Sequence, residues 1–516
     1  MPTSFRPRCR HAIAVATLVA LSWSHAAHTS AEALTERARL VAVYDDILSA
    51  RFDRARRLLS AACPPAPPAA CQALEAVVCW WQIVVDPRSR QFDARLQAAA
   101  TKAIETATAW TEQEPTRAES WFYLAGAHAP LVQWRILRGQ RLAAAREGSR
   151  IKAALERSLS LDPTLHDAKF GIGLYRYYAD VVPAPAKVVR WLLWLPGGDK
   201  IRGLHEMREA REHGALLTGE ADFQLHWLYL WYERQPARAL DLLRGLASRY
   251  PANPVFLQRI AEVQAEYLHD HPASAITWAS LLEAAGRGQV SEPGLALGRA
   301  RLGLGTALDA MFETDAAIAQ FEAVVQSQTG APHGATSEAR VRLGAAYDRL
   351  GHPARARAAY QKAIETAGPD DEARVKTRAR AGLSRPPDAR HAEAFRLSLD
   401  GLRAFERGDA ATALTALDRA SALAPVDTVI AYRHARVLLA QGRRVRARER
   451  LEQVIRASPE APAIVRASAH AEYAALLERE GDHQRASDHY RYALAIVGGA
   501  REAHDAARDA LARRVK

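Results

Sequence analysis

The chain of 516 residues lacks the short motifs that carry catalysis or nucleotide binding. No HExxH, GxSxG, CxxC or GxxxxGK[ST] pattern occurs in it. Nor does any segment alternate apolar and polar residues with the period of two that marks a half-buried strand. The first absence argues against an enzyme, and the second predicts an all-α fold.

Cysteine is scarce, with four residues in the whole chain, and Cys9 precedes the positions expected in the mature protein. If Cys71 and Cys79 share a helix they stand about 12 Å apart, too far for a bridge. Cys63 and Cys71 flank a proline-rich turn and are the preferred disulfide, which leaves Cys79 as a buried thiol. Three reduced cysteines remain the alternative. In an oxidising compartment the bridge is favoured.

Metal-binding patterns are weak, and no cofactor is expected. His205, Glu209 and His213 share one helix face, but the outer histidines would lie about 12 Å apart, too far for one ion. A charged helix surface explains them. The histidines of residues 269–271 lie in a loop where capping serves as well as ligation, so we predict no metal site.

The N-terminus has the pattern of a secretory signal. Arg6, Arg8 and Arg10 precede an apolar run at residues 12–21, and small residues suitable for cleavage follow up to Ala33. A membrane anchor is the alternative, although a spanning helix needs about 20 apolar residues. We therefore expect residues 1–33 to be removed and the mature chain to reach the periplasm without an integral membrane segment.

The formal charge of +12 comes with arginines scattered over helix faces. Only residues 443–450 form a dense basic group. A solvated face is the favoured interpretation, with a patch for nucleic acid or lipid headgroups as the alternative. No nucleic-acid partner is expected.

A recurring order of small and large residues dominates the second half of the chain. Leu343, Gly344, Tyr347, Gly351 and Ala356 give one copy. The central alanine of that order recurs in five copies, which are centred on Ala317, Ala356, Ala413, Ala447 and Ala486. This order resembles the tetratricopeptide repeat, which implies an α-solenoid of antiparallel helix pairs.

The expected organisation follows from where the repeats are regular. Residues 34–285 are predicted to be helical but divergent, with residues 133–150 as an extra helix. Regular repeats are expected in two groups, at residues 295–383 and 391–516. Ser384-Arg385-Pro386-Pro387 would stop a helix between them.

An aromatic-rich segment at residues 170–232 stands out within the divergent part. Its rings suit a recess for an amphipathic ligand, and an enlarged core needs the same residues. The candidate pocket residues are Tyr175, Tyr178, Trp194, Trp227 and Trp231. If they form a pocket, the protein is a periplasmic solute-binding or transporter-associated protein, which is the alternative function.

Glycines within this segment carry a further resemblance. The run at residues 170–175, then Gly198-Asp199-Lys200 and Gly203-Leu204, resembles the tetratricopeptide repeat protein thirty-nine family. The Pro-Gly-Gly-Asp-Lys sequence is also similar to the periplasmic tetratricopeptide component of TRAP-type transporters. Neither family supplies a catalytic residue. Asp199 is expected to cap the helix that follows.

A groove along the first helices of the pairs is the expected seat of function. Counting from Gly344 and its counterparts gives one set of candidate positions: Arg299, Asp309, Glu338, Asp348, Phe395, Phe405, Tyr432, Arg436 and Glu478. The lysine and asparagine clamp of chaperone-binding repeats is absent there. Ordinary solvated surface is the alternative for each residue. We predict an exported scaffold that binds protein partners of the bacterial cell envelope through this groove.

Overall fold

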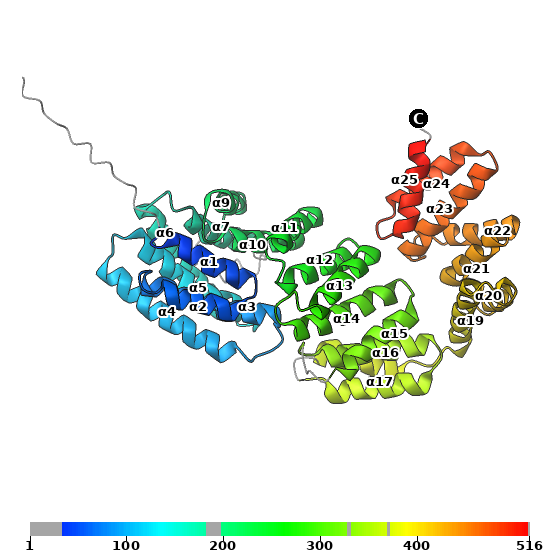
Figure 1. Cartoon of the computed structure of the whole chain (residues 1–516), viewed down its shortest axis with the longest axis horizontal. Coiled ribbons are helices and arrows are strands. Elements are labelled where there is room, and N and C mark those ends of the chain that lie inside the picture. Colours follow the sequence, from blue (N-terminus) through cyan, green and yellow to red (C-terminus); the bar gives the residue numbers. More distant parts are fainter. Residues whose placement is uncertain (1–33, 182–197, 328–331, 369–371, 514–516) are drawn as a thin grey trace, which may run out of the picture.

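The computed structural model describes residues 34–181, 198–327, 332–368 and 372–513. Throughout these parts the regular structure is helical and no strand occurs. The helices follow one another as antiparallel neighbours along a curved path (Figure 1). The all-α solenoid prediction is confirmed. The predicted signal at residues 1–33 lies outside the described residues.

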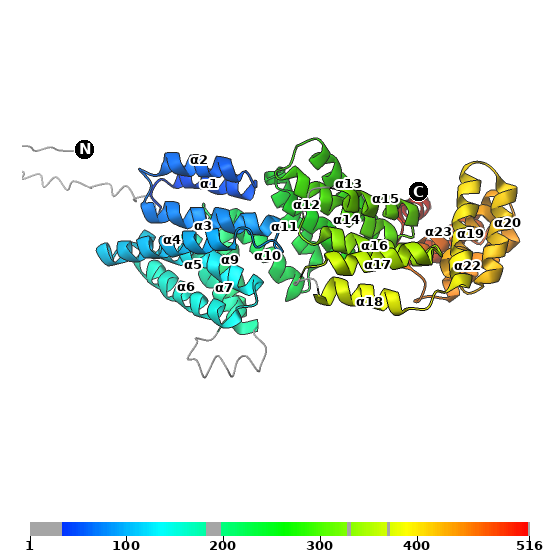
Figure 2. The same ribbon diagram turned by 90° about the horizontal axis from the view of Figure 1, so that it is seen from below.

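Among the described residues, eight helices form an irregular N-terminal part, and several of them are longer than the helices of the later pairs. They are α1 (Arg37–Leu48), α2 (Phe52–Ala62), α3 (Pro68–Val85), α4 (Asp93–Gln113), α5 (Ala118–Leu137), α6 (Arg141–Leu161), α7 (His166–Val181) and α9 (Lys200–His213). One hydrophobic core connects them with the next helices, from Leu34 to Val263. The helices of this part therefore pack as a cluster before the chain continues as a row of pairs (Figure 2).

Regular pairs follow from α10 onward. The first group is α10 (Thr218–Trp231), α11 (Pro236–Arg249), α12 (Pro254–Glu266), α13 (His271–Gly286), α14 (Pro293–Ala310), α15 (Thr314–Gln326), α16 (Ala335–Arg349) and α17 (Pro353–Thr366), followed by the π-helix η2 (Glu372–Lys376) and α18 (Thr377–Ser384). The second is α19 (Ala389–Glu406), α20 (Ala410–Leu423), α21 (Thr428–Ala440), α22 (Arg444–Arg456), α23 (Ala463–Arg479), α24 (His483–Ala495) and the closing α25 (Arg501–Arg513). The predicted domain limits stay a prediction.

Residues 133–150 do not form the single extra helix that the sequence suggested. The segment contains the end of α5, a turn at residues 138–140, and the start of α6. Gly139 has a φ of 77°, which a helix cannot contain. That prediction is therefore wrong, because the apolar pattern continues across a turn that glycine permits.

Two glycines of the family resemblance, Gly173 and Gly203, lie where helices α7 and α9 approach closely. A Cβ added to Gly173 would be 2.6 Å from the Gly203 carbonyl oxygen, and one on Gly203 would be 2.5 Å from that of Gly173. Asp199 caps α9 by accepting a 2.9 Å hydrogen bond from the Arg202 amide, as predicted. Small residues at this crossing therefore let two backbones touch.

By length and hydropathy, one helix in the described ranges could cross a membrane. It is α3, and 67% of its apolar window is buried inside the fold. It contacts α1, α2, α4, α5 and α12. This packing is typical of a core helix.

The repeat glycines make a direct stability prediction. A Cβ on Gly344 would lie 2.4 Å from the Tyr360 ring, and one on Gly382 would lie 2.3 Å from the same ring. Gly344→Ala should therefore lower the free energy of unfolding by about 1 to 3 kcal/mol, the usual cost of overpacking. Gly245→Ala on α11 is the matched control, since nothing lies within 4 Å of its added Cβ. Thermal unfolding should show an unchanged or higher midpoint for the control. A Gly344→Ala midpoint equal to that of the wild type would contradict this packing argument.

Candidate functional site

The first helices of successive pairs contact one another along one side of the solenoid. Contacts join α12 to α14, α14 to α16, α19 to α21, and α21 to α23. In an α-solenoid this row forms the inner, concave surface. The candidate groove residues belong to these helices, so their surroundings show what the inner surface offers to a partner.

Three of the groove residues are linked to residues 40 positions away on a neighbouring helix. Arg349 forms a 2.8 Å ion pair with Asp309. The Tyr432 hydroxyl donates to Glu472 at 2.9 Å. In the same way Glu338 accepts from Arg378. These links hold adjacent repeats together, and the Glu338 carboxyl also pairs with Arg342.

Two more acidic groove residues accept hydrogen bonds from tyrosines of their own helix pair. Tyr360 donates to Asp348 at 2.9 Å, and Tyr490 donates to Glu478 at 3.0 Å. In both cases the tyrosine follows the acid by 12 residues. These contacts tie the second helix of a pair to the first, so the groove acids contribute to the repeat itself.

Phe395 does not line the groove, and that prediction is wrong. Its side chain is 2% exposed. The Arg349 guanidinium lies 5.8 Å from the ring centroid and the Arg433 guanidinium 4.8 Å. Phe312, in the turn between α14 and α15, packs against the hydrophobic cluster that contains Phe395. Contacts within the chain therefore bury the Phe395 ring, although the repeat register places Phe395 on the groove surface.

Other groove residues differ in their exposure. Arg299 is largely buried and lies 3.6 Å from Asp86; burial lowers the pKa of Arg299, and Asp86 opposes that shift. Phe405 is half-buried, whereas Arg436 is exposed. The structure thus does not bring the nine predicted residues together as one open groove.

The aromatic pocket residues also separate. Tyr175 lies beside Gly148 of α6. Tyr178 belongs to a tyrosine triad with Tyr177 and Tyr232, whose ring centroids are 5.7 to 6.0 Å apart. Trp194 lies outside the described residues. The tyrosine triad and the two tryptophans on α10 therefore belong to different clusters.

Trp227, which is partly buried against the core, and Trp231 pack with two residues that the sequence analysis did not single out. Their ring centroids are 4.2 Å apart. The Arg259 guanidinium lies 4.7 Å above the Trp227 ring, and the Trp231 indole donates to the Tyr267 hydroxyl at 2.9 Å. Trp231 is 52% and Tyr267 38% exposed. We call these four residues, Trp227, Trp231, Arg259 and Tyr267, the inner aromatic patch.

The inner aromatic patch bridges the first helices of two successive pairs. Its tryptophans are on α10, Arg259 is on α12, and Tyr267 follows α12 directly. The Arg259 side chain also pairs with Glu262 at 2.6 Å. Arg259 lies 40 residues before the predicted groove residue Arg299, so carrying the repeat register one pair further back could have found it.

His226 packs against Trp227 of the inner aromatic patch, and it should make the stability of the fold depend on pH. Its ring is fully buried, 4.4 Å from the Trp227 ring between centroids, and its Nδ1 donates to the Phe223 carbonyl. Burial, and then nearby Arg259, lower the pKa of His226 to about 3.

In the unfolded chain, His226 therefore binds a proton near pH 6.5, its ordinary pKa. In the folded chain it stays neutral down to about pH 3. Above pH 6.5 His226 should therefore have no effect on the free energy of unfolding. Below pH 6.5 it should lower that free energy by about 1.4 kcal/mol for each pH unit. Urea unfolding at pH 7.5 and 5 measures the loss. His226→Asn should show a loss about 2 kcal/mol smaller over that interval. An equal loss in both proteins would show that His226 titrates normally.

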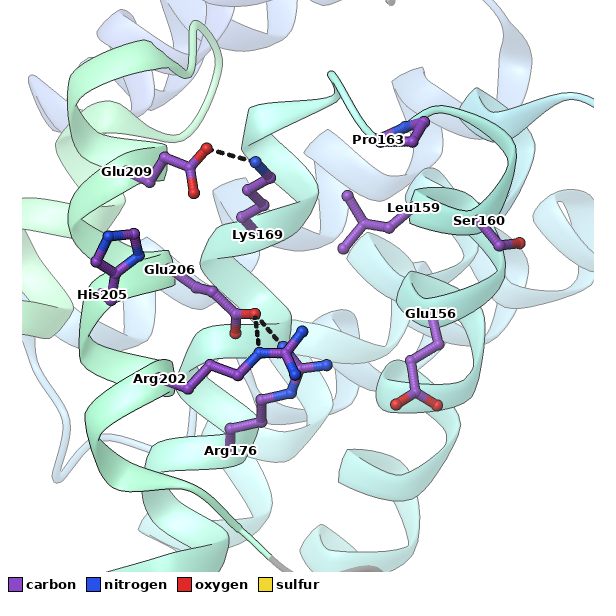
Figure 3. Close-up of a pocket in the computed structure, with 10 residues that line it drawn as sticks. All are labelled: Glu156, Leu159, Ser160, Pro163, Lys169, Arg176, Arg202, His205, Glu206 and Glu209. Carbon is purple, nitrogen blue, oxygen red and sulfur yellow. Dashed lines mark hydrogen bonds and ion pairs between the residues drawn. The ribbon is translucent and has the colours of Figure 1, made fainter.

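A charged recess of about 490 Å³ lies between α6, α7 and α9 (Figure 3). Glu206 pairs with both Arg176 and Arg202, the latter at 3.0 Å, and Lys169 pairs with Glu209. The hydrogen bond from Lys169 lowers the pKa of Glu209. Opposite charges balance one another here, as on a salt-bridged surface. Within the described residues no group of three or more possible metal ligands occurs.

Cys63 and Cys71 form a disulfide with Cα atoms 6.4 Å apart, and Cys79 is a buried free thiol. The bridge joins the end of α2 to the start of α3. Burial raises the pKa of Cys79, so this thiol is a packing residue.

Two family models of the tetratricopeptide repeat match the chain, at residues 337–368 and 404–475. No curated protein matches it. Among solved structures, the human IFIT1 dimer with PPP-AAAA is 12% identical, covering 83% of this chain and 96% of that one with a TM-score of 0.34. The APC/C hetero-tetramer Cut9-Hcn1 is 14% identical, covering 93% and 97% with a TM-score of 0.23. The chain therefore contains tetratricopeptide repeats at these residues.

Proposed function

We propose that this protein is an exported scaffold that binds protein partners of the bacterial cell envelope along its inner surface. Tetratricopeptide repeats support protein binding. The signal pattern of residues 1–33 supports export. A scaffold needs no catalytic residue, in keeping with the missing catalytic motifs.

The inner aromatic patch is the observation that carries the proposal. Exposed tryptophan and tyrosine rings beside an arginine are the residue types that dominate binding energy at protein interfaces. Trp231 and Tyr267 fix each other by a hydrogen bond, so their rings lose little conformational freedom when a partner binds. We therefore place the main partner contact on α10 and α12 rather than in the C-terminal groove.

In-cell crosslinking of the tagged protein, followed by mass spectrometry, tests the proposal. We expect envelope proteins to be captured reproducibly, and their yield to fall in Trp231→Ala/Tyr267→Ala. The double variant Tyr432→Ala/Arg436→Ala tests the C-terminal groove in parallel and should retain most of the capture. Capture of cytoplasmic proteins alone would contradict the envelope assignment. Loss of capture only in the second variant would return the site to the C-terminal groove.

A further inference from the structure

The turn between α5 and α6 exposes three aliphatic side chains on one tip. Ile136 is 61%, Leu137 39% and Leu142 63% exposed. The turn is tight, because the Gln140 amide donates to the Arg135 carbonyl at 2.7 Å and Gly139 has a positive φ. The last turn of α5 and the first of α6 therefore present these side chains together. We call residues 136–142 the α5–α6 tip.

The exposed charges of the α5–α6 tip are positive. Residues 131–146 contain four arginines and no acid. Arg141 and Arg146 are exposed. Arg135 and Arg138 are paired internally, with Glu147 and Asp93. The two nearby acids are thus already neutralised, and the outward charges are positive.

Arg138 also fixes the tip to the rest of the fold. It is 8% exposed and donates to the Pro87 carbonyl at 2.8 Å and the Ser89 carbonyl at 2.7 Å, in the connection between α3 and α4. That connection carries Arg90, which is exposed as well. The tip is therefore a fixed, basic and aliphatic surface.

We propose that the α5–α6 tip docks the protein on an anionic bilayer surface. Aliphatic side chains enter the boundary between headgroups and acyl chains, while arginines beside them attract anionic lipid. Exposed isoleucine and leucine distinguish this surface from one for nucleic acid, which uses phosphate contacts and stacking rings. The tip would hold the scaffold at a membrane and leave the inner aromatic patch for protein partners.

The dense arginine group on α22 offers a built-in comparison. Val445 is 74% exposed there. Two of its neighbouring arginines pair with acids, Arg446 with Asp418 and Arg448 with Glu480. That segment therefore combines one small aliphatic side chain with partly neutralised charge, and we expect it not to hold a membrane.

Vesicle co-sedimentation tests the proposal on the chain from Leu34 onward, which contains every described helix. The probes are phosphatidylcholine vesicles with and without phosphatidylglycerol. Binding should be about tenfold stronger to the anionic vesicles and weaken with added salt. Ile136→Ser/Leu142→Ser should reduce it by about fivefold or more, and Arg141→Gln/Arg146→Gln several-fold. Val445→Ser is the matched control and should bind as the wild type does.

Three outcomes would overturn the proposal. They are no binding of the wild type to anionic vesicles, equal binding to both vesicle types, and unchanged binding of Ile136→Ser/Leu142→Ser. Circular dichroism and thermal midpoints of each variant show whether the fold is retained, which is expected because the changed side chains are exposed. Since partner capture is measured separately, failure here leaves the proposed function standing.

Discussion

Replacing Arg433 with alanine is expected to lower the free energy of unfolding by about 2 to 4 kcal/mol and to loosen the C-terminal pairs from the rest of the solenoid. Arg433 is 6% exposed. It donates to the Ser398 hydroxyl at 2.8 Å and, across 121 residues, to the Phe312 carbonyl at 3.0 Å. Burial lowers its pKa to about 10, so it stays charged at neutral pH. Removing it leaves the partly buried Phe312 carbonyl without this donor and a space beside Phe395.

Thermal unfolding and limited proteolysis measure this effect. The exposed link at residues 385–388 joins α18 to α19, and we expect faster cleavage there once the contact is lost. Arg436→Ala on the same helix is the matched control, because Arg436 is exposed and its loss should change stability by less than about 0.5 kcal/mol. Equal stability of the two variants would show that Arg433 does not hold the two groups of pairs together.

The inner aromatic patch carries the largest expected effect on binding. Trp231→Ala with Tyr267→Ala should weaken affinity for a captured partner by about 30-fold or more, since a truncated hot-spot residue costs about 2 kcal/mol or more. Both side chains are substantially exposed, so the fold should be retained. Isothermal titration calorimetry or surface plasmon resonance with the purified partner measures the affinity of the wild type and of the variant.

Tyr492→Ala provides the control for that experiment. Tyr492 is 57% exposed on α24, the second helix of its pair, and so lies away from the row of first helices. Its loss should leave affinity unchanged. If this control weakens binding as much as the patch variant does, the partner is bound by the outer helices and the patch is wrongly assigned.

The repeat part of the fold could be predicted because its determinants are local. Small residues such as Gly344 mark where a neighbouring ring packs, and turn glycines such as Gly351 and Gly442 have the positive φ that ends a first helix. Between α14 and α15 the same place is held by Phe312, with a φ of 63°. Residue spacing in the sequence therefore predicts the repeat, although the turn at Phe312 lacks the glycine that the later repeats have there.

The candidate site could be predicted only in part, because its residues depend on contacts between distant segments. The repeat register placed Phe395 on the first-helix face but could not show that Arg349 and Arg433 pack over its ring. The aromatic count likewise marked Trp227 and Trp231 without showing that α12 supplies Arg259 and Tyr267. Such contacts follow from the curvature of the whole path, which no single repeat encodes.

Site-specific photo-crosslinking in cells shows which surface of the solenoid meets the partner. A photoreactive phenylalanine analogue at position 267 samples the inner aromatic patch, and the same group at position 492 samples the outer surface. We expect discrete crosslinked envelope proteins from position 267 and none of these from position 492. The same products from both positions, or products from position 492 alone, would contradict a scaffold that binds its partners along the inner surface.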